Sequence, residues 1–224
     1  MNLPDDVTKK LEELRVIFKR LIYCPITLIP RKRVVFPDLT IELWVSQRKL
    51  PLALRADAII APVAPDLKMV FGVAKMIRDM GADVVQYQAN LAAPKAAGEA
   101  FVGAGARFRY KFTALAVIFD ESKRTSQAII SSAIAKSMLL LRESGAKSVV
   151  VPDMTENLLT QPNWITPEQR QETAEVTARL LVDAILASGS NIKKVKIWVW
   201  DPVNAKCYID ELDRMKKRQQ ALAA

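Results

Sequence analysis

The feature that most constrains the fold is an alternation of two local patterns that begins at about residue 37. Short runs of β-type residues alternate with longer stretches in which apolar residues recur at helical spacing. This alternation is typical of a largely parallel sheet covered by helices on both faces. The expected strands are Thr40–Val45, Asp57–Ala61, Glu99–Gly103, Phe112–Phe119, Ser148–Val151 and Val195–Trp200, and the expected helices are Gly72–Met80, Ser126–Ser144, Pro167–Ala187 and Asn204–Gln219.

Two of these helices have clear boundary signals. Thr166 offers an N-cap hydroxyl, Pro167 occupies the first helical position, and Gln169 can complete a capping box. The helix that begins at Ser126 stops at Gly145, a residue suited to a helix end. In sheets of this class, ligands bind beyond the carboxyl ends of the strands. The segments in which we expect a binding site are therefore 62–71, 120–125, 152–165 and 201–203.

Residues 1–36 are interpreted as an N-terminal extension, followed by a main domain at 37–224. Within the extension, residues 5–23 predict an amphipathic helix that packs on the main domain or on a second subunit, which would make a homo-oligomer. Attachment to an anionic membrane surface is an alternative that the acidic residues Glu12 and Glu13 disfavour. The apolar positions of this helix are Val7, Leu11, Leu14, Phe18 and Leu21.

Composition excludes several classes of protein. The 224 residues are 50% hydrophobic and 25% charged, and no apolar run is long enough to span a bilayer, so we expect a cytoplasmic protein. The chain has two cysteines and no histidine, which gives no support to a zinc site or a cysteine–histidine nucleophile. No cofactor motif is present. The net charge of +9 favours a polyanionic partner or simply a well-solvated surface.

Between about residues 40 and 215, the order of segments resembles the macrodomain family. This three-layer α/β/α module is known for binding ADP-ribose, and some members hydrolyse ADP-ribose from its attachments. The resemblance rests on five segments in the family's order, none of which is specific alone. They are ADAIIAPVAPD (56–66), VFGVAKMIRDMGA (70–82), GEAFVGAGARFRYKFTALAVIFD (98–120), SAIAKSMLLLRESGAKSVVVPDM (132–154) and VKIWVWD (195–201).

The ligand-binding residues of that family are mostly absent from this sequence. The asparagines of the first loop fall on Ala61 and Ala64, and its run of glycines is reduced to Gly72, which follows bulky residues at 69–71. Large side chains there block the close backbone approach that lets amides surround a diphosphate. No acid lies in 43–56 to match the family's adenine-binding carboxylate.

The family's second phosphate loop and its catalytic acid are also missing. The loop falls on 153–169, which contains no glycine, and Ala74 follows Val73 where a catalytic carboxylate stands in the family. The resemblance therefore argues against ADP-ribosyl hydrolysis. A match does occur at Trp200 and Asp201, where the family stacks an aromatic ring on adenine.

Three sets of residues are candidates for ligand binding. Trp200, with Asp201, can stack a nucleobase or cap the core. The helix start at Gly72 and Val73 can hold an anion with help from Lys68, or the loop is merely stiffened by prolines. The 153–165 loop is a candidate lid over the site, and the ordinary alternative is that its acidic residues are solvated at the surface. The full set is Asp66, Lys68, Gly72, Val73, Asp153, Thr155, Glu156, Asn157, Trp200 and Asp201.

A divalent cation near Asp120, Asp153 and Glu156 is a weaker interpretation, because hard cations need several oxygen ligands in defined geometry. The sequence therefore predicts no metal site.

The stretch RFRYKF (107–112) is the main argument for a different function. At the period of a strand, Arg107, Arg109 and Lys111 share one face that can neutralise phosphates, while the aromatics share the other. The aromatics then face away from the cations and cannot stack bases there, which disfavours nucleic acid.

The sequence as a whole predicts a non-catalytic, macrodomain-like module that binds ADP-ribose or a related nucleotide. The alternative is a protein- or nucleic-acid-interaction module whose ligand pocket is filled by Met69, Val70 and Phe71.

Overall fold

A seven-stranded sheet forms the centre of the protein. The computed structural model describes residues 30–46, 54–104, 110–158, 166–188 and 191–223. The strands lie in the order β1-β2-β7-β6-β3-β5-β4; β1 and β4 pair antiparallel with their neighbours, and the remaining pairs are parallel. Their bounds are β1 Lys32–Val35, β2 Thr40–Val45, β3 Ala58–Val63, β4 Ala100–Ala104, β5 Phe112–Val117, β6 Ser148–Pro152 and β7 Lys194–Val199.

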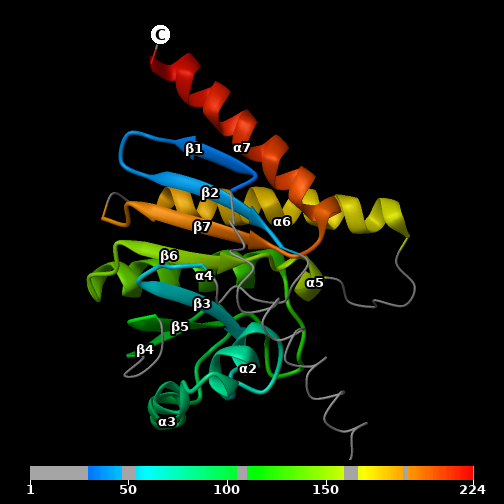
Figure 1. The fold of residues 1–224 in the computed structure, drawn as a ribbon. Helices are drawn as coiled ribbons and strands as arrows, with labels where there is room; N and C mark the ends of the chain where they lie inside the picture. The colour runs from blue at the N-terminus through cyan, green and yellow to red at the C-terminus, as the bar shows by residue number, and fades with distance from the viewer. Residues whose placement is uncertain (1–29, 47–53, 105–109, 159–165, 189–190, 224) are drawn as a thin grey trace, which may run out of the picture.

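Helices cover both faces of the sheet, so the predicted three-layer fold is confirmed (Figure 1). α4, α6 and α7 pack on one face, and α2 and α3 pack on the other. Side chains of β3 alternate between the layers: Ile60 enters the core with α4 and α6, and Ile59 enters the core with α2 and α3. The helices are α2 Gly72–Asp79, α3 Asp83–Ala92, α4 Gln127–Glu143, α5 Thr155–Leu158, α6 Pro167–Ala187 and α7 Pro202–Ala223.

All six expected strands are present, with small shifts at their ends. The strand predicted at Asp57–Ala61 runs over Ala58–Val63, and the strand predicted at Phe112–Phe119 ends at Val117. The sequence did not predict β1, α3 or α5. β1 is short and contains two cations, so its strand character comes from pairing with β2. It lies within the segment assigned to the N-terminal extension.

The predicted helix caps are correct where the structure describes them. The Thr166 hydroxyl accepts a hydrogen bond from the Gln169 amide and the Gln169 side chain accepts one from the Thr166 amide, which makes the capping box of α6. At α4, the Ser126 hydroxyl accepts from the Ile129 amide, and Gly145 ends the helix with a φ of +84°. None of the described helices is long and apolar enough to cross a membrane.

Candidate functional site

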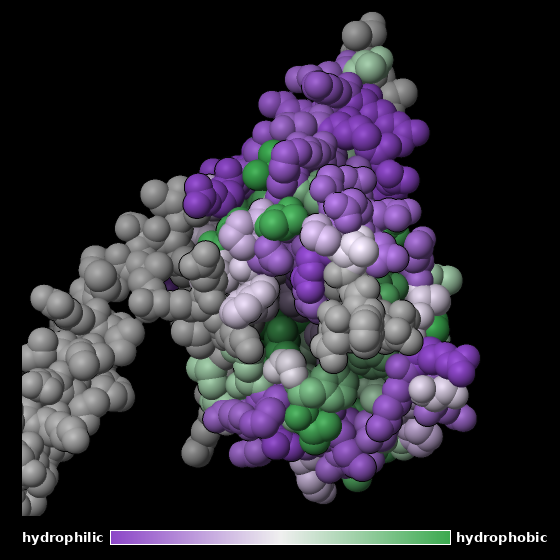
Figure 2. All heavy atoms as spheres, turned by 90° about the vertical axis from the view of Figure 1, so that its right-hand side faces the viewer, coloured by the Kyte–Doolittle hydropathy of each residue, from purple (hydrophilic) through white to green (hydrophobic). Residues whose placement is uncertain are grey.

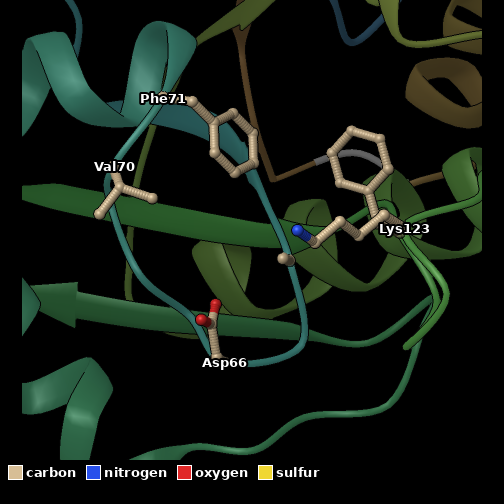
Figure 3. A pocket seen from close by; sticks show the side chains of 6 residues that line it. Asp66, Val70, Phe71 and Lys123 are labelled. Carbon is tan, nitrogen blue, oxygen red and sulfur yellow. The ribbon is translucent and has the colours of Figure 1, made fainter.

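The loops after β3 and β5 enclose a cavity at the carboxyl-end edge of the sheet. Its volume is about 400 Å³. Figure 2 views this edge from outside and shows hydrophobic side chains around a hollow in the lower half of the face. The lining residues are Ala64, Asp66, Val70 and Phe71 from the first loop and Phe119 and Lys123 from the second (Figure 3).

Contacts with α3 determine which side chains of the first loop face the cavity. The Met69 amide donates to Gln86 Oε1 at 2.7 Å, and Gln86 Nε2 donates to the Leu67 carbonyl at 3.3 Å. Leu67 and Met69 are fully buried in the core beneath. Val70 and Phe71 remain 49% and 37% exposed. The expectation that all three residues of 69–71 fill the pocket is therefore wrong, because the backbone alternates them between the core and the cavity wall.

An aromatic wall and a cation meet in the cavity. The rings of Phe71 and Phe119 lie edge to face with centroids 5.8 Å apart. Lys123 lies in a tight turn and has a φ of +60°. Its amide donates a hydrogen bond of 3.0 Å to the Asp120 carbonyl, which closes the turn. Figure 3 shows its amine directed into the space between Phe71 and Asp66. The arrangement suits a ligand with an apolar part and an anionic part.

The N-terminus of α2 opens beside this wall. Its N-cap residue Phe71 makes no side-chain hydrogen bond to the helix, and the first turn contains no acidic residue. The amides of the first turn and the positive end of the helix dipole therefore remain without a side-chain cap. Gly72 adopts a φ of +52°, which turns the loop into the helix. Nearby, Asp66 is paired with Lys68, whose amide donates to Asp66 Oδ1 at 3.1 Å.

Trp200 follows β7 at the same edge of the sheet and is 41% exposed. This exposure fits a stacking surface better than a buried core position, and its role as a ligand contact stays a prediction. Asp201 Oδ1 accepts from the Val203 amide at 2.8 Å at the start of α7. Its other carboxylate oxygen lies 3.6 Å from Arg170.

Asp153 is the centre of a hydrogen-bond network between β6 and α7. Its carboxylate accepts from the Thr155 amide and hydroxyl at 3.0 and 2.7 Å, from Asn204 Nδ2 at 2.7 Å and from the Tyr208 hydroxyl at 2.9 Å. Burial raises the pKa of Tyr208 well above its usual value, and the Asp153 charge adds to this, so the hydroxyl stays a donor. The structure thus gives Asp153 and the buried Thr155 a structural role that the sequence did not predict.

In the predicted loop 153–165 after β6, residues 159–165 lie outside the described residues, and Glu156 and Asn157 belong to α5. Glu156 forms an ion pair with Arg170, which links α5 to α6. Asn157 is half-buried in α5. Among the described residues, no group of three or more acids or cysteines is arranged to hold a metal ion.

The predicted basic strand face is described only in part. Tyr110 is buried and donates to the Leu54 carbonyl at 2.7 Å. Lys111 is exposed and pairs with Asp57 at 3.2 Å. Arg107 and Arg109 lie outside the described residues, so a nucleic-acid surface there stays a prediction.

Of the lining residues, Asp66 alone was among the predicted ligand-binding residues. Ala64, Val70 and Phe71 were expected to weaken or fill the site, and Phe119 and Lys123 were not considered as ligand contacts. The loop to which Lys123 belongs was expected to border a site. Its lysine had no distinguishing local pattern, because the positive φ that directs it depends on the turn with Asp120.

Comparisons with known proteins agree with this architecture. No protein-family model and no curated protein matches the chain. The structure is similar to an Oceanobacillus iheyensis macrodomain solved with ADP, with a TM-score of 0.65 and 14% identity over 84% of this chain and 97% of that one. It is also similar to a Trypanosoma brucei macrodomain in complex with ADP, with a TM-score of 0.60 and 12% identity over 77% and 68% of the two chains.

A third similar structure is the macro domain of ganglioside induced differentiation associated protein 2, with a TM-score of 0.57 and 17% identity over 77% of this chain and 82% of that one. The chain therefore has the macrodomain fold, as its sequence predicted.

Proposed function

We propose that this protein binds ADP-ribose or a related nucleotide at the carboxyl-end edge of its sheet, without hydrolysing it. The observation that carries the proposal is the cavity in which an aromatic wall, the Lys123 amine and the uncapped start of α2 meet. The ADP bound in two macrodomains of similar structure supports the same class of ligand.

The anionic part of the ligand is assigned to the start of α2. Free amides at a helix start and the positive end of its dipole favour phosphate. Lys123 adds a full positive charge from the opposite loop, so the two loops would hold a phosphate between them. Because Val70 and Phe71 replace bare glycine backbone, fewer amides can surround the phosphates, and we expect weaker binding than a glycine-rich loop provides.

The base of the nucleotide is assigned to Trp200. In the strand order, β7 is followed by β6, β3 and β5, so the ends of β7 and β5 are three spacings, or about 14 Å, apart. A nucleotide that contacts both Trp200 and Lys123 must extend over roughly that distance. A nucleoside diphosphate joined to a second sugar can do so, whereas a mononucleotide would reach one end alone. This favours an ADP-ribose-like ligand over AMP.

The absence of catalysis is inferred from the acids at the site. A general base must lie within hydrogen-bond reach of the reacting group. The first turn of α2 contains no acid, and the one acid that lines the cavity, Asp66, is exposed and paired with Lys68. Asp153, Glu156 and Asp201 are engaged by hydrogen bonds or ion pairs.

Isothermal titration calorimetry with ADP-ribose, ADP and AMP tests the proposal. Replacing Trp200 by alanine should weaken ADP-ribose binding by about 1–3 kcal/mol, roughly 5- to 150-fold, through the loss of stacking. Lys123→Gln should weaken ADP-ribose and ADP more than AMP. Lys123 is exposed, so Lys123→Gln should melt within about 2 °C of the wild type. Trp200 is 41% exposed, so Trp200→Ala should lower the melting temperature without preventing folding.

Lys193→Gln provides the matched control. This lysine is also exposed, but it precedes β7 and thus lies at the opposite edge of the sheet, so its loss should leave binding unchanged. No binding of any of the three nucleotides would overturn the proposal and favour an interaction module. Release of ADP-ribose from a modified substrate would contradict the absence of catalysis.

A further inference from the structure

α3 lies at the outer edge of the molecule (Figure 1). It carries several exposed hydrophobic side chains. Leu91 is 73% exposed, Tyr87 66%, Met80 52% and Val84 43%. Met80 is the C-cap of α2, and Gly81 and Ala82 separate it from α3. The other three lie on α3 at successive spacings of three and four residues. This is the spacing of the contact line in paired helices. We call these four residues the α3 stripe.

The α3 stripe is not needed to hold α3 on its own domain. The opposite side of the helix packs into the core through Val85 and Ala89. Gln86 holds the first loop, and Gln88 accepts a hydrogen bond from the Ala104 amide at 3.0 Å. The inward side of α3 is thus fully engaged, while its outward side offers a second apolar contact surface.

The segment that contains the α3 stripe carries few charges, although Arg78 and Asp79 directly precede Met80. Residues 80–94 include one charged side chain, Asp83, whereas a quarter of the whole chain is charged and its net charge is +9. Interface centres are depleted in charge and enriched in aromatic residues and methionine. The line that Val84, Tyr87 and Leu91 form on α3 is too narrow for a large partner surface, and its spacing fits one amphipathic helix.

The chain itself contains such a helix in its sequence. Residues 5–23 lie outside the described part of the chain, and they predict an amphipathic helix. Its apolar positions are separated by four, three, four and three residues, which includes the three- and four-residue spacings of Val84, Tyr87 and Leu91. Two lines with the same spacing can interdigitate along their length. These apolar positions are Val7, Leu11, Leu14, Phe18 and Leu21.

The sheet is too wide for this helix to reach the α3 stripe of its own copy. The segment joins the described chain at residue 30, next to β1, and β1 and β4 are the two edges of the sheet. Six strand spacings separate them, about 29 Å. α3 packs on the β4 side. Residue 23 and residue 30 are seven Cα–Cα steps apart, which extend over about 25 Å at most. A second copy has no such restriction.

We propose that the α3 stripe binds residues 5–23 of a second copy of this chain, and that the exchange is reciprocal. Each copy then contributes one helix and one stripe, and the two contacts form a closed two-fold dimer. The proposal does not depend on nucleotide binding.

Two double variants test the two sides of the contact in the full chain. One is Tyr87→Ser with Leu91→Ser on the α3 stripe, and the other is Leu14→Ser with Phe18→Ser on the helix. Sedimentation velocity and light scattering from about 1 to 100 μM should show a wild-type dimer and two monomeric variants, since small interfaces associate in this range. Val35→Thr is the matched control: Val35 is 64% exposed on β1, and its loss should leave the dimer intact.

An equimolar mixture of the two double variants identifies the exchange. The stripe variant retains a normal helix and the helix variant retains a normal stripe, so the mixture should regain one contact and form heterodimers. A monomeric wild type would overturn the proposal. A stripe variant that stays dimeric would show that the helices pair with each other, and a helix variant that stays dimeric would show that the stripes do. Melting temperatures within about 2 °C of the wild type exclude misfolding, because the stripe is exposed.

Discussion

Removing the Asp153 carboxylate is the change that best separates its structural role from its predicted role in ligand binding. Asp153 accepts four hydrogen bonds, two from Thr155 and one each from Asn204 and Tyr208. Tyr208 and Asn204 are buried, at 0% and 1% exposure. Thr155, which donates the other two bonds, is also 0% exposed, so an Asp153→Ala variant leaves donors on three buried residues without their acceptor.

The expected loss of stability can be estimated from these contacts. A buried group that loses its partner costs about 1–3 kcal/mol, and hydrogen bonds to a charged group contribute about 1.5–3 kcal/mol each. Because the bonds share one carboxylate, their effects do not add fully, and we expect Asp153→Ala to lower the free energy of unfolding by about 3–5 kcal/mol. In a chain of this size that corresponds to a melting temperature about 6–20 °C lower.

Urea unfolding followed by circular dichroism measures this effect. Tyr208→Phe removes one bond and should cost about 1.5–3 kcal/mol. In the double variant Asp153→Ala with Tyr208→Phe, the loss of unfolding free energy should be smaller than the sum of the two single losses by at least about 1 kcal/mol. Asp79→Ala is the matched control, since this exposed carboxylate pairs with Lys75 and Arg78 at the surface and its loss should cost under about 0.5 kcal/mol. The structural role is refuted if Asp153→Ala unfolds at the same urea concentration as the wild type. If that variant also loses nucleotide binding, the role of Asp153 in ligand binding that the sequence predicted is supported instead.

Three further changes test individual parts of the structure. Gly72→Ala should lower the free energy of unfolding by about 1 kcal/mol, measured by urea unfolding, because φ is +52° there although a new Cβ would meet no neighbour. Ser126→Ala should cost about 1 kcal/mol in the same assay by removing the α4 cap, and an unchanged stability would contradict the capping role. Burial alone would raise the pKa of Asp57, but hydrogen bonds from the Lys147 amide, Lys111 and Ser148 outweigh it and lower the pKa below 3.8. This carboxylate therefore stabilises the fold above pH 3.8 and ceases to do so as the pH falls through its folded-state pKa, so Asp57→Asn should show a flatter loss of stability on acidification in urea titrations from about pH 5 to 3.

Local patterns in the amino-acid sequence were enough to predict the layered fold. Strand and helix periodicities depend on neighbouring residues, so the alternation along the chain predicted the strands and the helices on both faces. Caps are equally local, and the predicted boundaries at Ser126 and Thr166 are correct. β1 was missed because its four residues become a strand only by pairing with β2.

Tertiary contacts decided the details of the site. A loop has no fixed period, so nothing in residues 67–71 indicates that Leu67 and Met69 are buried while Val70 and Phe71 border a cavity; the hydrogen bonds of Gln86 on α3 decide it. From the sequence alone, Asp153 is interpreted as an acidic loop residue. Its structural role depends on Tyr208 of α7, which is 55 residues further along the chain and donates a hydrogen bond to it. Side-chain direction outside regular elements depends on groups distant in sequence, and those meet only when the sheet has assembled.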